Sequence, residues 1–186
     1  FSEGVEIGGL AEGALLRMVP ESLEVVRAGK EDDRNGTDYW VRRRHGLPAL
    51  SIDVKHRSLC PVERFGSDDA CIETTSVYRG DAFDEALRRD WRNGPYLDEN
   101  RAAIGWTLNG KKRTDYVMYT WPHADGLRFW IVPFHPLCSA SRINWRAWAA
   151  KYGEKPALNR DYVTLNVFVP RHEIARAMRA VMVGVA

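Results

Sequence analysis

Alternation of apolar and polar positions predicts six β-strands in this sequence. The segments are rich in β-branched and aromatic residues, and turn-forming residues lie near several of their ends. They cover residues 38–44, 49–56, 70–78, 114–121, 127–133 and 162–169. The turn His45-Gly46-Leu47-Pro48 joins the first two segments, so we expect a hairpin there. We expect the third segment to extend the same sheet.

Helical signals lie on both sides of these strands. Pro20 suits a first helical position and predicts a short helix that ends near Gly29, followed by a loop over residues 30–37. Helices are also predicted for the charged segment 81–91, for the amphipathic segment 143–152, and at the C-terminal end, where Ile174, Met178 and Val181 recur at helical spacing. The fold class expected is therefore α/β, in the α+β sense of a central mixed sheet flanked by helices.

Length and composition are those of an ordinary globular domain. The chain has 186 residues, of which 45% are hydrophobic and 28% are charged. No internal repeat or linker is visible, so we expect a single domain over residues 1–186. No apolar run approaches the roughly 20 residues that cross a bilayer, so no membrane partner is expected. Three widely spaced cysteines do not make a disulfide framework, and they fit a cytoplasmic location.

The net charge of +2 is too small to indicate a nucleic-acid partner by itself. Short basic clusters carry more information than the total. They lie at Arg42-Arg43-Arg44, His56-Arg57, Arg88-Arg89 and Lys111-Lys112-Arg113. Clusters that share one face can follow a phosphate backbone, and the plainer alternative is a set of solvated surfaces.

Asp53 and Lys55 carry the clearest chemistry in the sequence. The period of two along a strand places both on one face, with Ile52 and Val54 on the other. Hydrolysis of a phosphodiester with Mg²⁺ requires oxygen ligands and a cation near the attacking water or the phosphate. The pair supplies both groups. The plainer interpretation is an ion pair on a solvent-facing strand.

Other carboxylates could join Asp53 at one metal ion. Asp38 lies across the predicted hairpin, and Glu73 lies on the third strand, on the same face as Cys71 and Thr75. For Glu73 a half-exposed structural position is an equal alternative. Glu24, on the helix predicted before the hairpin, is a possible additional acid and is preferred over its neighbour Glu21.

The order of these residues resembles the PD-(D/E)XK nuclease superfamily, which includes restriction endonucleases, resolvases and exonucleases. Its core pattern is a helix with a glutamate, a strand with an aspartate, and a strand that ends in Asp-x-Lys. A group of small phage and bacterial members adds further motifs, which are matched here by Ile52-Asp53-Val54-Lys55-His56-Arg57, Ile72-Glu73, Gly105-Trp106 and Thr114-Asp115-Tyr116-Val117-Met118-Tyr119. The chain departs from this pattern in two ways. Thr37 stands before Asp38 where the family has a proline. The second departure is the spacing of 31 residues between Glu73 and Gly105, which suggests an inserted helical element.

The resemblance implies a restriction-endonuclease-like core and a nuclease that depends on Mg²⁺ or Mn²⁺ and acts on nucleic acid, with DNA as the expected substrate. Asp53, Glu73 and Asp38 would hold the metal, and Lys55 would position and polarise the attacking water. The residues expected to hold phosphates are Arg57, Arg43, Lys111, Lys112 and Arg113. The alternative is a catalytically inactive nuclease fold that binds DNA or a protein partner within a phage, plasmid or defence complex.

Three further signals bear on other kinds of site. His135 and Cys138 have the spacing of zinc ligands, but no second pair matches them. Trp145 and Trp148, three residues apart on a predicted helix, could line a cleft and stack on bases. Asp115 opens a predicted strand, and we interpret it as a turn cap.

Overall fold

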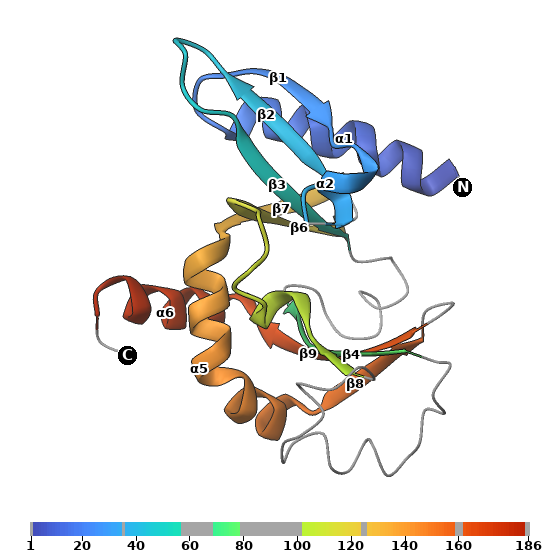
Figure 1. The fold of residues 1–186 in the computed structure, drawn as a ribbon, viewed down its shortest axis with the longest axis vertical. Helices are drawn as coiled ribbons and strands as arrows, with labels where there is room; N and C mark the ends of the chain where they lie inside the picture. Colours follow the sequence, from blue (N-terminus) through green and yellow to red (C-terminus); the bar gives the residue numbers. More distant parts are fainter. Residues whose placement is uncertain are drawn as a thin grey trace. The chain divides into compact units, whose positions relative to one another are not determined.

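The computed structural model describes residues 2–34, 36–56, 69–78, 102–123, 126–158 and 162–184. The chain divides into two compact units (Figure 1). The first comprises Phe1–Ser67 and Lys112–Phe134, and the second comprises Asp68–Lys111 and His135–Ala186. The expectation of a single domain stays a prediction. The predicted helix at 81–91 and the phosphate-binding role of Arg57 concern residues outside the described part of the chain.

The first unit is built on a five-stranded mixed sheet with the strand order β1-β2-β3-β6-β7. Its helices and strands are α1 (Ser2–Met18), β1 (Ser22–Arg27), α2 (Lys30–Arg34), β2 (Tyr39–Arg43), β3 (Leu50–His56), β6 (Tyr116–His123) and β7 (Gly126–Pro133). The strands β1, β2 and β3 run antiparallel in chain order, whereas β6 lies parallel to β3. The α+β class with a mixed sheet is therefore confirmed, as is the hairpin of β2 and β3.

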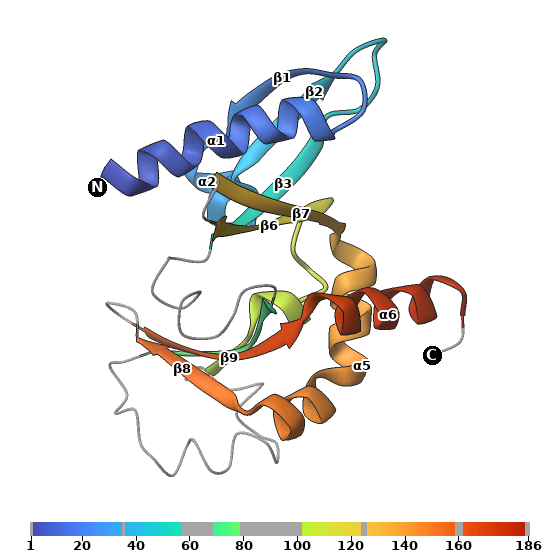
Figure 2. The ribbon, with the colours of Figure 1, turned by 180° about the vertical axis from the view of Figure 1, so that it is seen from behind.

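Strand alternation gives this sheet one face that packs against α1, which runs across the sheet in Figure 2. Ala11, Ala14 and Leu15 of the helix are buried with side chains of three strands, including Ile52 at 0% exposure. Burying a branched aliphatic side chain of this size contributes about 1.5–3 kcal/mol. Because Ile52 and Val54 pack on the side of α1, the alternating residues Asp53 and Lys55 must lie on the opposite face.

Asp115 fixes the start of β6 beside β3. Its Oδ2 accepts hydrogen bonds from the backbone N–H of Ser51 (2.8 Å) and from the Ser51 hydroxyl (2.9 Å). The Asp115 backbone N–H donates to Ser51 Oγ at 2.9 Å. The Thr-Asp-Tyr motif thus contributes to the parallel pairing of β3 with β6, and Asp115 bonds a distant strand where a local turn cap was predicted.

The second unit contains a four-stranded sheet with the order β5-β4-β9-β8 and two long helices. Its elements are β4 (Asp69–Tyr78), β5 (Ala102–Ile104), the 3₁₀ helix η4 (Trp106–Leu108), α5 (Phe134–Tyr152), β8 (Glu154–Leu158), β9 (Tyr162–Pro170) and α6 (Arg171–Met182). Ile72, Val167 and Val169 are fully buried, as are Ile174 on α6 and Leu137 on α5.

Two predictions about the sheets are wrong. The segment predicted to form a helix after Pro20 is the strand β1, in which Val25 and Val26 pair with β2. Glu21 has a φ of 59°, which is incompatible with a right-handed helix at the start of this segment. The third predicted strand, β4, does not extend the first sheet, since it pairs with β5 and β9. Alternation identifies a strand but does not identify its neighbours.

The helices also differ from the prediction. The helix α1 is absent from the predicted elements, and residues Lys30–Arg34 of the expected loop form the short helix α2. The helix expected at 143–152 begins earlier, at Phe134. None of the described helices is long and apolar enough to cross a membrane.

Gly105 permits a close approach of two backbones in the second unit. A Cβ atom at this position would lie 2.2 Å from the Glu73 carbonyl oxygen. The Gly105 N–H donates to the Thr74 carbonyl at 2.9 Å, next to an irregularity in the pairing of β4 with β9. Only glycine can occupy this position without displacing the β4 backbone.

We therefore expect Gly105→Ala to lower the free energy of unfolding by roughly 1–3 kcal/mol or more, because the added methyl group meets backbone rather than a movable side chain. The matched control is Gly9→Ala on α1, where a Cβ meets nothing within 4 Å. That variant should gain about 0.5–1 kcal/mol through helix propensity. Urea denaturation measures both, and equal stability of the two variants would contradict the close backbone approach at Gly105.

Candidate active site

Asp38, Asp53 and Lys55 come together in the first unit. Asp38 directly precedes β2, in which Tyr39 pairs with Ile52, and a hydrogen bond joins its carboxyl to that of Asp53. The Asp38 backbone N–H donates to the Ile52 carbonyl at 2.8 Å, which ties Asp38 to β3. Two adjacent strands therefore present their carboxylates side by side, as expected for a shared site.

Asp53 is buried and paired with a lysine. Its residue exposure is only 3%, and its Oδ1 lies 2.7 Å from the Lys55 ammonium nitrogen. One third of the Lys55 side chain remains exposed to solvent. Breaking such a pair would leave a buried carboxylate without compensation, a large cost in free energy. The lysine is thus held at the site while part of it stays accessible.

The Asp38 carboxylate is oriented by the backbone of β3. Its Oδ2 accepts a hydrogen bond from the Val54 N–H at 2.6 Å, in place of a bond between the two strands' backbones. Burial raises the pKa of Asp38 above its ordinary value. The charge of Asp53 and a hydrogen bond to its carboxyl raise this pKa further, against the lowering effects of the Val54 N–H and of Lys55.

Basic residues lie beside the segment that leads into Asp38. The Thr37 hydroxyl donates to the Arg113 carbonyl at 3.1 Å. A Cβ atom at Gly36, whose φ is +93°, would lie 3.0 Å from Cδ of Lys112. The Lys112 side chain and the Arg113 backbone therefore lie beside the two residues that precede Asp38, although they are far from Asp38 in the chain.

Other predicted residues lie elsewhere. Glu24 is on β1, not on a helix, and its Oε2 bonds Arg42 at 3.1 Å on an exposed surface. Arg43 donates from Nε to the Pro48 carbonyl within its own hairpin. Lys111 is exposed in the loop after η4, at the boundary of the second unit. These residues are not brought to Asp53 by the sheet of the first unit.

Glu73 belongs to the second unit, on β4. Its Oε1 accepts the Trp106 N–H at 3.2 Å, and its backbone N–H donates to the Thr107 hydroxyl at 3.1 Å. The Glu and Gly-Trp motifs thus interlock β4 with η4. This contact favours the structural alternative for Glu73, and its role as a metal ligand stays a prediction.

A glutamate of α1, on the other face of this sheet, is absent from the sequence predictions. Glu12 of α1 lies close enough to Tyr39 for its charge to raise the pKa of that phenol, after the larger effect of burial. Tyr39 is buried with α1, on the face opposite to Asp53 and Lys55, so this interaction does not bring Glu12 to the site. The available signal was the helical spacing of Ala11, Ala14 and Leu15.

Within the described residues, no group of three or more His, Cys, Asp or Glu side chains is arranged to hold a metal ion. The site defined by the first unit is therefore a two-carboxylate site with one lysine. Comparison of the chain with protein-family models, curated proteins and solved structures finds no match.

The raised pKa of Asp38 predicts that Asp38→Asn stabilises the fold at neutral pH, since the amide oxygen can still accept the Val54 N–H. A carboxyl with a raised folded-state pKa destabilises the fold only when it is ionised. The stability gain of the variant should therefore grow as pH rises through the window above the ordinary aspartate pKa, and vanish below it.

Thermal denaturation of both proteins between about pH 4 and 7 measures this difference. A variant less stable than the wild type at neutral pH would contradict the burial of an ionisable carboxyl at Asp38.

Proposed function

We propose that this protein is a divalent-metal-dependent nuclease that hydrolyses phosphodiester bonds of nucleic acid, with DNA as the expected substrate. The observation that carries the proposal is the arrangement on β2 and β3. Two partly or fully buried carboxylates, Asp38 and Asp53, lie side by side, and the Lys55 ammonium is 2.7 Å from Asp53. This residue order and placement resemble the PD-(D/E)XK pattern.

The donor set fits Mg²⁺ or Mn²⁺. Both carboxylates offer hard oxygen ligands. In enzymes that act on phosphate groups, Mg²⁺ is commonly held by one or two protein carboxylates and keeps several of its waters. After burial, repulsion from Asp53 contributes to the raised pKa of Asp38, and a divalent cation would relieve that repulsion. When bound, such an ion lowers the pKa of water and neutralises charge on the phosphate.

The chain's own groups supply the remaining functions. The Val54 N–H orients the Asp38 carboxylate, and β3 fixes Asp53 and Lys55 two residues apart on the same face. The exposed part of Lys55 can donate to the attacking water or to a phosphate oxygen. Lys112 and Arg113, beside the segment before Asp38, can attract the substrate's phosphates.

Single-residue variants test this assignment. In assays with Mg²⁺ or Mn²⁺ and labelled single-stranded and duplex DNA, Asp53→Asn and Lys55→Gln should each reduce the cleavage rate by about 10²–10³ or more, the range found when one charge-stabilising group is removed. An asparagine side chain has the size of the aspartate that it replaces, which limits any loss of folding.

The control is Glu24→Gln, which removes an acid of the same sheet that is paired with Arg42 outside the site. It should cleave at the wild-type rate. Equal cleavage by all four proteins, or cleavage that persists in EDTA, would refute the proposal. DNA binding without any cleavage or metal binding would instead support the inactive-module alternative.

A further inference from the structure

Positive charge is concentrated on the two long helices of the second unit. Together α5 and α6 carry six Lys or Arg residues and one acid. The cations are Arg142, Arg146, Lys151, Arg171, Arg176 and Arg179. The acid, Glu173, is neutralised by Lys151, whose Nζ lies 2.6 Å from Oε1. Because the whole chain has a net charge of only +2, the rest of it is negative overall, and the two helices carry a local excess of positive charge.

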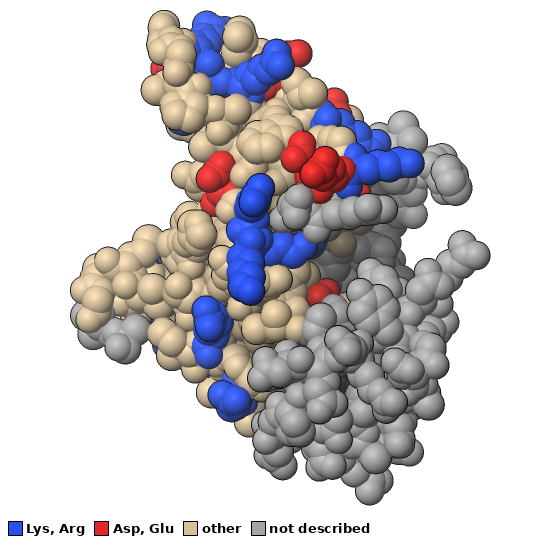
Figure 3. All heavy atoms as spheres, in the orientation of Figure 1, with Lys and Arg blue, Asp and Glu red and all other residues tan. Residues whose placement is uncertain are grey.

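Basic side chains lie over α5 on the face shown in Figure 3. Arg142 and Arg146 are exposed, and the Arg146 guanidinium is 4.7 Å from the centre of the Trp145 ring. Five of the six cations on these helices are arginines, whose planar guanidinium matches phosphate oxygens. The charge therefore favours a partner that carries phosphates.

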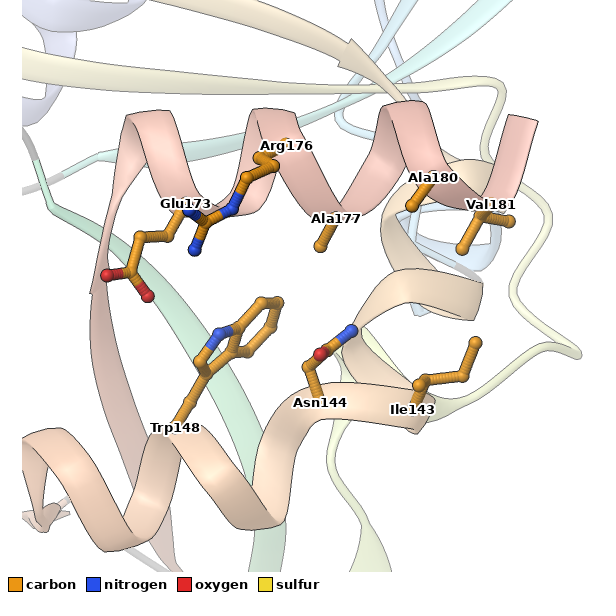
Figure 4. Close-up of a pocket in the computed structure, with 8 residues that line it drawn as sticks. All are labelled: Ile143, Asn144, Trp148, Glu173, Arg176, Ala177, Ala180 and Val181. Atoms are coloured by element: carbon orange, nitrogen blue, oxygen red, sulfur yellow. The ribbon is translucent and has the colours of Figure 1, made fainter. Parts of the chain in front are cut away.

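A groove separates α5 from α6, with a cavity volume of about 330 Å³ (Figure 4). Trp148 and Asn144 of α5 point into it, and Arg176 reaches into it from α6. Ala177 and Ala180 leave space on the α6 side. The remaining lining residues are Ile143, Glu173 and Val181. The groove thus combines an apolar floor with one cation and one amide, beside the Glu173 carboxylate that Lys151 neutralises.

We propose that the α5–α6 groove binds a single strand of nucleic acid, with a phosphate on Arg176 and an unpaired base or sugar against the exposed Ile143, beside Trp148, which is 6% exposed. The identity of the partner rests on the proposed nuclease function. A single strand fits better than a duplex, because paired bases are stacked inside a duplex and only its backbone would reach an apolar floor. Proteins that bind single strands combine basic grooves with aromatic side chains in this way.

Asn144 adds a polar contact for a base. Its Nδ2 donates to the Ala140 carbonyl at 2.8 Å, which fixes the side chain with its carboxamide in the groove. The Oδ1 atom can then accept a hydrogen bond from an amino group on a base edge. This gives the groove a means to distinguish bases that plain phosphate binding lacks.

Two variants separate the charge of the groove from its shape. Arg176→Gln removes the cation, and Ala180→Leu fills the space without changing charge. The matched controls are Lys30→Gln on α2, which removes one exposed cation of the first unit, and Ala147→Leu, at an exposed position of α5 outside the groove. Circular dichroism melting establishes that each variant is folded.

Binding is measured by fluorescence anisotropy in EDTA, with labelled oligothymidylate and a duplex of equal length over a salt series. Wild type should bind the single strand more tightly. Arg176→Gln should weaken this binding and reduce the salt slope by about 0.7, the value for one phosphate contact on a single strand. Ala180→Leu should weaken it roughly fivefold or more with an unchanged slope. The controls should match wild type.

Wild-type affinity in both groove variants would overturn the proposal, as would equal binding of duplex and single strand. If polyglutamate that carries the same charge as the oligonucleotide displaces it, the groove would be assigned to an acidic protein instead. Because EDTA removes the metal, binding that depends on Arg176 without any metal-dependent cleavage would refute only the nuclease function. Cleavage that requires Asp53 but ignores Arg176 and Ala180 would refute only the groove.

Discussion

The repulsion between two carboxylates on neighbouring strands is the physical constraint on which the first unit's site depends. The carboxyls of Asp38, just before β2, and Asp53, on β3, lie side by side, and Asp53 is almost fully buried. Two like charges in such a place require compensation. The Lys55 ammonium lies 2.7 Å from Asp53 Oδ1, and the Val54 N–H donates to Asp38 Oδ2 at 2.6 Å. A divalent cation bound between the carboxylates would balance the remaining negative charge.

The rest of the unit holds this arrangement in register. A slip of one residue would turn Asp53 toward α1 and Ile52 toward the site, so the burial of Ile52 fixes the face on which the acids lie. Asp115 and Ser51 add a second constraint by joining β6 to β3. The packing of one face thus determines the chemistry of the other.

The strands that carry the site were predictable because they obey local rules. The alternation Ile52-Asp53-Val54-Lys55 and the hairpin turn after Arg44 both act over a few residues, and both strand predictions are confirmed. The helix α1 escaped prediction because glycines at positions 4, 8, 9 and 13 weaken its propensity, while tertiary packing of Ala11 and Leu15 stabilises it. The segment after Pro20 carries local helix signals, but the pairing of its two valines with β2 outweighs them.

Partners distant in sequence could not be predicted in the same way. The strand β4 was identified, but its pairing with β9 joins residues far apart in the chain, as in the bond between Thr74 and Leu165. Glu73 and Gly105-Trp106 have a packing role between β4 and η4. The excess of positive charge on α5 and α6 was also missed, because its arginines are spaced along helices and not clustered in sequence.

Calorimetric titration of Mn²⁺ tests the central claim most directly, since it measures whether Asp38 and Asp53 hold one ion. We predict one binding site in the wild type and in Glu24→Gln, and loss of most of the binding heat in Asp38→Asn and in Asp53→Asn. Equal Mn²⁺ affinity in all four proteins would contradict the account.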